Sequence, residues 1–91
     1  MSAETTTSTT VIVRYFAAAR AAAGMEAEPI ELPVGASVID ALAAVRERHG
    51  TELARVLERC SFLLDEVAVR NRSVPLSDGS TLDVLPPFAG G

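Results

Sequence analysis

The last six residues of the chain are those whose types and spacing point most directly to chemistry. They read Pro86-Pro87-Phe88-Ala89-Gly90-Gly91. Adjacent prolines favour an extended backbone that makes little use of sheet hydrogen bonds, and glycines pass through a slot that any larger residue would block. At ~3.3 Å per residue this segment reaches roughly 20 Å. The pattern predicts an extended tail with the free α-carboxylate of Gly91 at its tip.

The side chains that usually carry catalysis are sparse. The chain has one histidine, His49, and one cysteine, Cys60. We interpret His49 as a structural residue at a helix C-terminus, where a cation suits the dipole, and Cys60 as a buried structural thiol. Asp65 and Glu66 are interpreted as solvated turn residues. One cysteine cannot build a disulfide or a multi-cysteine metal site, and a Gly-rich phosphate loop is missing, so we expect no metal or cofactor bound by the chain itself.

Length and charge narrow the class of protein. Ninety-one residues allow one domain. The net charge is −4 and all basic residues are arginines, which argues against nucleic acid as a main partner. Apolar runs are too short for a membrane span, the N-terminus does not resemble a secretory signal, and cysteine is rare, so we expect a cytoplasmic protein without a membrane partner.

The hydrophobic pattern divides the chain into a disordered leader (1–10), a folded domain (11–85) and the extended tail (86–91). Strands are predicted over 11–16, 28–34, 61–64, 67–70 and 81–85. A short helix is predicted over 17–23, the main helix over 38–49, and a further short helix from 51. Ser37 is a good N-cap for the main helix, with Asp40 completing a capping box, and Thr51 is expected to cap the helix that follows.

This order of elements fits an α+β fold, a small mixed sheet with one main helix packed across it. The first and last strands could pair as parallel neighbours at its centre. Pro29 and Pro33 cannot donate ladder hydrogen bonds, so their strand should lie at an edge. Its inward side should carry Ile30, Leu32 and Val34, and Ile39 should join the buried face of the main helix. The predicted core is Val11, Val13, Tyr15, Ile30, Leu32, Val38, Leu42, Val45, Phe62, Leu64, Leu82 and Val84.

Several segments together resemble the ubiquitin-like MoaD/ThiS family of sulfur carriers, and within it the small subunits of molybdopterin synthase. They are the ending Val84-Leu85-Pro86-Pro87-Phe88-Ala89-Gly90-Gly91, the preceding Pro75-Leu76-Ser77-Asp78-Gly79, Tyr15-Phe16-Ala17, and Gly35-Ala36-Ser37-Val38 with Ala41-Leu42. The resemblance covers about residues 11–91. It is most specific in the tail, and between 51 and 71 it holds only in pattern.

The resemblance implies a β-grasp fold with a flexible C-terminal tail. It also implies that a ubiquitin-activating-like adenylyltransferase uses ATP to convert the Gly91 carboxylate to an acyl-adenylate, which a sulfur donor converts to a thiocarboxylate. The tail then enters the large synthase subunit and gives its sulfur to cyclic pyranopterin monophosphate, building the molybdopterin dithiolene. The chain would be a non-catalytic carrier in an assembly of two small and two large subunits.

Other readings remain open at this point. The chain could be a sulfur carrier for thiamin or cysteine biosynthesis, a ubiquitin-like protein modifier, or an interaction domain without covalent chemistry. The pair Pro86-Pro87 favours the molybdopterin branch, because thiamin carriers usually lack it. We expect the large subunit to dock on the exposed sheet face near the last strand, with Phe88 inserted as an apolar anchor.

Overall fold

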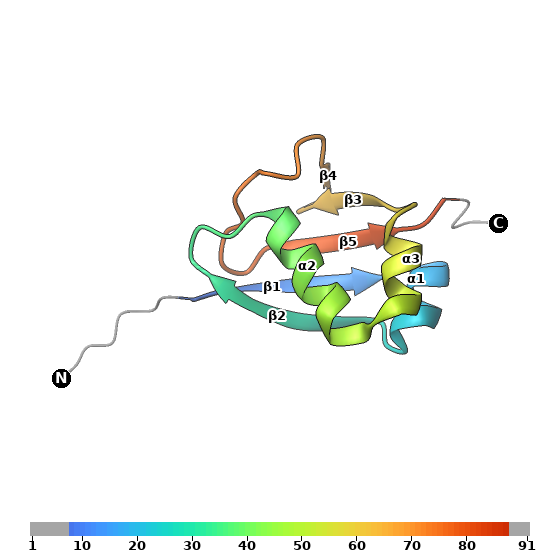
Figure 1. Cartoon of the computed structure of the whole chain (residues 1–91). Coiled ribbons are helices and arrows are strands. Elements are labelled where there is room, and N and C mark those ends of the chain that lie inside the picture. The colour runs from blue at the N-terminus through green and yellow to red at the C-terminus, as the bar shows by residue number, and fades with distance from the viewer. Residues whose placement is uncertain (1–7, 88–91) are drawn as a thin grey trace.

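The computed structural model of the chain describes residues 8–87, and Figure 1 shows their arrangement. The elements in chain order are β1 (Ser8–Tyr15), α1 (Ala17–Ala23), β2 (Ala27–Pro33), α2 (Val38–His49), α3 (Thr51–Leu57), β3 (Ser61–Leu64), β4 (Val67–Ala68) and β5 (Thr81–Leu85). They form one sheet in the order β2-β1-β5-β3-β4. The central neighbours β1 and β5 run parallel and the other pairs are antiparallel. The predicted α+β class and the parallel central pair are confirmed.

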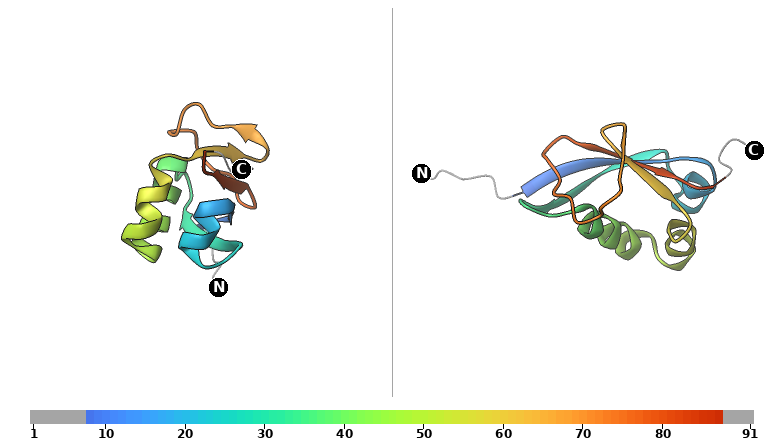
Figure 2. Two further views of the ribbon diagram at one scale, coloured as in Figure 1. Left: turned by 90° about the vertical axis from the view of Figure 1, so that its right-hand side faces the viewer. Right: turned by 90° about the horizontal axis from the view of Figure 1, so that it is seen from above.

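The core lies between one face of this sheet and the helices. Figure 2 shows α2 and α3 on the same side of the sheet, and α1 packs against α3. Buried and outward residues alternate along β1, as the two-residue period of a strand requires. Every predicted core residue is buried except Leu64, which is partly buried against the cluster. Leu53 and Leu57 of α3 add to this core.

The main helix begins where its sequence predicted. The Ser37 hydroxyl accepts from the Asp40 N–H, and the Asp40 carboxylate accepts from the Ser37 N–H at 2.8 Å, which completes the capping box. Two details of the helical prediction are wrong. Ile39 is 48% exposed, because it lies one position away from the buried Val38. Thr51 is not the N-cap of α3 but its first residue, and the N-cap position is taken by Gly50.

The first strand starts earlier than predicted. β1 begins at Ser8, so residues 8–10 belong to the sheet and not to the leader, whose first seven residues lie outside the described part. Residues 8–10 pair with residues 31–33 of β2, and a turn far along the chain also binds Thr10. Asp78 Oδ1 accepts from the Thr10 N–H at 2.8 Å, and the Gly79 N–H donates to the Thr10 carbonyl at 2.7 Å. Gly79 has φ 87°, a left-handed conformation that glycine adopts without strain.

The edge position of β2 is confirmed, since within residues 8–87 it pairs with β1 alone. One of the three residues predicted to face the core from β2 is wrong. Val34 is 64% exposed because the strand ends at Pro33, and the third inward position is taken by Glu28.

The hairpin between β3 and β4 turns tightly at Asp65 and Glu66, as predicted. Both have positive φ, 49° and 72°, as a two-residue hairpin turn of the primed type requires. β4 covers only Val67–Ala68, so it is shorter than the predicted 67–70. Asp65 accepts from the Thr81 N–H at 2.9 Å through Oδ1, which ties the turn to β5. Within residues 8–87, the helices are all too short or too polar to span a bilayer.

Candidate functional site

The predicted tail is held at its root by the central strand of the sheet. β5 is paired on both sides, with β1 and with β3, and it leads directly into Pro86. Beyond the strand pairing, the Phe16 N–H donates to the Val84 carbonyl at 3.2 Å. Pro86 is buried and Pro87 is exposed, so the body of the domain extends to Pro86, one residue further than predicted.

The reactive end of the predicted site lies outside the described residues. Phe88, Ala89, Gly90 and Gly91 all belong to that part of the chain. The assignment of chemistry to the Gly91 carboxylate therefore stays a prediction. What the structure provides is its starting point, at the end of β5 (Figure 1).

The sheet face opposite α2 and α3 is the surface that continues from this root. Because residues alternate along strands, its side chains come from positions between the core residues. Three of them are apolar and partly buried: Ile12 on β1, Leu63 on β3 and Leu85 on β5. This face was predicted as the docking surface, and we call it the open sheet face.

An ion pair that the sequence did not predict lies on the open sheet face. Arg14 Nε is 2.7 Å from Asp83 Oδ1, and Arg14 Nη2 is 2.9 Å from Asp83 Oδ2. The side chain of Asp83 is only 6% exposed, whereas that of Arg14 is 46% exposed. The hydrogen bond to Asp83 and the charge of that carboxylate raise the pKa of Arg14.

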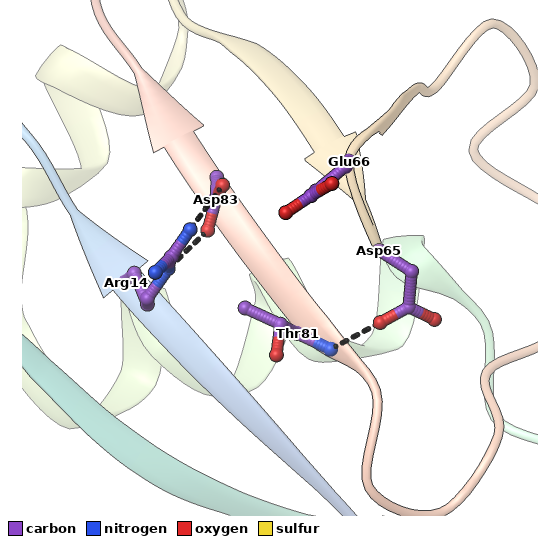
Figure 3. Close-up of a pocket in the computed structure, with 5 residues that line it drawn as sticks. All are labelled: Arg14, Asp65, Glu66, Thr81 and Asp83. Atoms are coloured by element: carbon purple, nitrogen blue, oxygen red, sulfur yellow. Dashed lines mark hydrogen bonds and ion pairs between the residues drawn. The ribbon is translucent and has the colours of Figure 1, made fainter.

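Figure 3 shows that this pair borders a shallow pocket of about 250 Å³ beside the β3–β4 turn. Asp65, Glu66 and Thr81 complete its lining. Glu66 points toward Asp83 in this view, while Asp65 binds the main chain of Thr81 (Figure 3). Sequence reasoning missed the pair because its two members are 69 residues apart. The available signal was a charged residue at the outward position of each central strand.

A second polar cluster lies on the helix side of the sheet. The buried Glu28 accepts from the Tyr15 hydroxyl at 2.6 Å and from Arg48 Nη1 at 2.8 Å, and it also binds His49 Nε2. Burial alone would raise the pKa of Glu28, but the hydrogen bonds from Tyr15, His49 and Arg48 outweigh it and hold that pKa below its ordinary value. Burial and the bond to Glu28 raise the pKa of Tyr15.

The predicted places of the two single-copy residues are confirmed. His49 is the last residue of α2, although its partner there is Glu28, which the sequence analysis did not assign. Cys60 is 6% exposed and its Sγ donates to the Val56 carbonyl at 3.2 Å. Burial raises the pKa of Cys60, and a buried thiol is a poor nucleophile because the thiolate is the reactive form.

Known proteins resemble this chain over most of its length. Residues 13–91 match the ThiS family. The molybdopterin synthase sulfur carrier subunit of Chlamydomonas reinhardtii is 36% identical over 80 residues, which make up 87% of this chain and 95% of that protein.

Solved structures show the same fold. A putative molybdopterin converting factor, subunit 1, from Pyrococcus furiosus has a TM-score of 0.76 at 30% identity, covering 88% of this chain and 99% of that one. A chain in the complex of subunits 1 and 2 of molybdopterin-converting factor from Helicobacter pylori has a TM-score of 0.69 at 27% identity, covering 90% and 99%. Together with the mixed sheet and the helix across it, these similarities confirm the predicted β-grasp fold.

Proposed function

This chain belongs to the ThiS family, and on that premise we propose that it is the sulfur-carrier small subunit of a molybdopterin synthase. One observation carries the proposal: a protein that is 36% identical over 87% of this chain is a molybdopterin synthase sulfur carrier subunit. The family match also runs to Gly91. The pair Pro86-Pro87 favours this branch over a thiamin carrier. The alternative is a protein modifier, which would use the same activated glycine and would form covalent conjugates.

The proposed chemistry takes place at the main-chain carboxylate of Gly91. A carboxylate resists nucleophilic attack, so a ubiquitin-activating-like adenylyltransferase first joins it to the AMP part of ATP and releases pyrophosphate. A sulfur donor then displaces AMP and leaves a thiocarboxylate. In the large subunit this sulfur passes to cyclic pyranopterin monophosphate and becomes part of the dithiolene. We place the process in the cytoplasm, because a chain with a single cysteine is typical of a reducing compartment.

The described body supplies a fixed starting point for the tail. Four residues follow Pro87, and at ~3.5 Å each they reach about 14 Å. A partner that receives Gly91 must therefore lie against the end of β5, and a stable interface of about 800 Å² per partner must extend beyond the tail. We propose that the large subunit covers the open sheet face, that Phe88 is an apolar anchor, and that two small and two large subunits assemble. The solved complex of the Helicobacter pylori relative supports a large-subunit partner.

Intact-mass measurement tests the proposed chemistry. The chain is incubated with the adenylyltransferase, ATP and a sulfur source, and replacement of one oxygen by sulfur adds about 16 Da. One residue added after Gly91 should abolish loading, because it moves the reactive carbon by ~3.5 Å and even a ~1 Å misplacement can cost a hundredfold in rate. Gly90→Ala should be less severe, since the terminal carboxylate remains.

Two controls separate tail chemistry from folding. Cys60→Ser should load normally, because the buried thiol has no role in the proposed mechanism. Deleting Gly90 and Gly91 should stop loading without changing the urea unfolding midpoint. Normal loading of the extended chain, or loss of transfer in Cys60→Ser, would show that the carrier mechanism is wrong. Covalent conjugates to many proteins, in place of sulfur transfer in the large subunit, would favour the modifier.

A further inference from the structure

The Arg14–Asp83 pair occupies an unusual position for a buried carboxylate. Asp83 lies between the core residues Leu82 and Val84, so its side chain points to the open sheet face. It is nevertheless 4% exposed as a residue. Its strand neighbours on this face are Arg14 on β1 and Leu63 on β3. Both of its oxygens accept from Arg14, in the bidentate geometry that makes arginine–carboxylate pairs strong.

The two members of the pair are not equivalent. The Asp83 side chain is 6% exposed and is held in place by the sheet, whereas the Arg14 side chain is 46% exposed. The Arg14 guanidinium also lies 5.6 Å from the centre of the Phe16 ring. Its bonds to Asp83 use Nε and Nη2, and among residues 8–87 no acceptor binds Nη1, which can therefore donate to a partner. Loss of Arg14 would leave a charge that cannot move, whereas loss of Asp83 would leave one that can turn toward water.

The pair also lies within the area that a tail-binding partner must cover. Asp83 is two residues before Leu85 on the same face, and the described chain ends at Pro87. The four residues beyond Pro87 reach only about 14 Å. A protein that encloses Gly91 is therefore pressed against the end of β5 and the partly buried Leu63 and Leu85.

We infer that Arg14 and Asp83 together determine which partner surface this carrier accepts, an inference that rests on the proposed function. The large subunit covers the pair, and the hydrogen bonds between Arg14 and Asp83 stay formed in the complex. Its facing surface is apolar opposite Leu63 and Leu85 and offers one hydrogen-bond acceptor to Arg14 Nη1. A surface without that acceptor leaves a charged donor unpaired in the interface, which disfavours the wrong partner.

Electrostatics predicts a specific pattern among variants. Enclosing one unpaired charge is costly, while replacing both members of a buried pair by apolar groups is often neutral. Arg14→Leu leaves Asp83 without its partner beneath the large subunit, so it should weaken binding most. Asp83→Ala leaves the mobile Arg14 and should weaken binding less. The double variant removes both charges and should recover most of the affinity, apart from the lost contact to Nη1.

The experiment is a double-mutant cycle on the dissociation constant for the large subunit, measured by calorimetry with full-length chains. Urea titrations of each variant give the fraction of folded chain, and each Kd is calculated from the concentration of folded chain. We expect Arg14→Leu to raise the Kd roughly 30-fold or more, and Asp83→Ala to raise it roughly 3- to 10-fold. The double variant should bind within about tenfold of wild type and more tightly than Arg14→Leu.

The cycle separates this inference from the proposed function. Single losses that simply add in the double variant, or an unchanged Kd for Arg14→Leu, overturn the role of the pair while the carrier function stands. A wild-type chain that does not bind the large subunit overturns the proposed function and the inference with it. If Arg14→Leu does not fold, Asp83→Ala and the double variant decide the matter. A double variant that binds more than about tenfold more weakly than Asp83→Ala contradicts the inference.

Discussion

Glu28 and Asp83 are both carboxylates that the fold withdraws from water, but they lie on opposite faces of the sheet. Glu28, on β2, faces the helices and is bound by Tyr15 from β1 and by Arg48 and His49 from α2. Asp83, on β5, faces away from the helices and is bound by Arg14 alone among charged side chains of residues 8–87. One carboxylate is satisfied by three donors within the fold, and the other by a single arginine on an open face.

The difference suggests separate roles, with the Glu28 cluster stabilising the fold and the Arg14–Asp83 pair acting in partner binding. The donors to Glu28 come from two elements that must pack together before the cluster can form, so its energy contributes to folding. The Arg14–Asp83 pair joins β1 and β5, which are already held side by side by their parallel strand pairing. Asp83 is buried, but the Arg14 side chain is 46% exposed, so water screens the pair and limits its contribution to stability. Its larger effect should appear only when a partner encloses it.

The largest expected effect is the loss of the Glu28 cluster. Glu28→Ala leaves the buried Tyr15 hydroxyl without its acceptor and removes charge-assisted bonds to Arg48 and His49. We expect the free energy of unfolding to fall by about 3 kcal/mol, measured by urea titration. Glu31→Ala, on the exposed side of the same strand, is the matched control and should change it by less than about 0.5 kcal/mol. Equal effects of the two substitutions would remove the contrast between the faces.

Acid should act through the same cluster. The pKa of Glu28 is lowered in the folded state, so its contribution to stability is present above the ordinary glutamate pKa of 4.5 and is lost as pH falls through the folded value. Unfolding free energy measured from pH 6 downward should therefore decrease below about pH 4.5. Glu28→Gln should flatten this decrease relative to wild type, whereas Glu31→Gln should retain it. An unchanged slope in Glu28→Gln would show that other groups cause the acid loss.

The smallest expected effect on folding belongs to the open face. Asp83→Asn keeps the shape of the side chain and one oxygen that can accept from Arg14. Because Arg14 is 46% exposed, the free energy of unfolding should fall by less than about 1 kcal/mol. The same titration used for Glu28→Ala measures it. A loss as large as that of Glu28→Ala would mean that both carboxylates serve the fold.

Features encoded by neighbouring residues were predictable from the sequence. The capping box of α2 joins Ser37 to Asp40, and the β3–β4 turn needs only Asp65 and Glu66, so local preferences were sufficient. The α+β class and the edge position of β2 also followed from local pattern and proline placement. The exposed Val34 and Ile39 were assigned wrongly, because each lies at or next to an element end, where periodicity no longer fixes the face.

The polar groups that join distant segments were not predictable in this way. Glu28 meets partners 13, 20 and 21 residues away, and Arg14 meets Asp83 across 69 residues. Such contacts depend on which strands become neighbours and on where α2 packs, and the local sequence pattern specifies neither. The start of β1 at Ser8 has the same cause, since residues 8–10 pair with β2 and Thr10 is bound by the distant Asp78 and Gly79. The tail was identified from its composition, without reference to any of these contacts.

The parallel pairing of β1 and β5 also has a mechanical consequence. The chain enters the sheet at Ser8 and leaves it at Leu85, at opposite ends of the two central strands (Figure 1). A force that pulls the C-terminal end away from the N-terminal end runs along these strands and loads their hydrogen bonds together, in shear. Peeling a strand from the edge would break such bonds one after another. A force applied to the C-terminal tail must therefore break the β1–β5 pairing in one step, and the rate of that step is the unfolding rate under load.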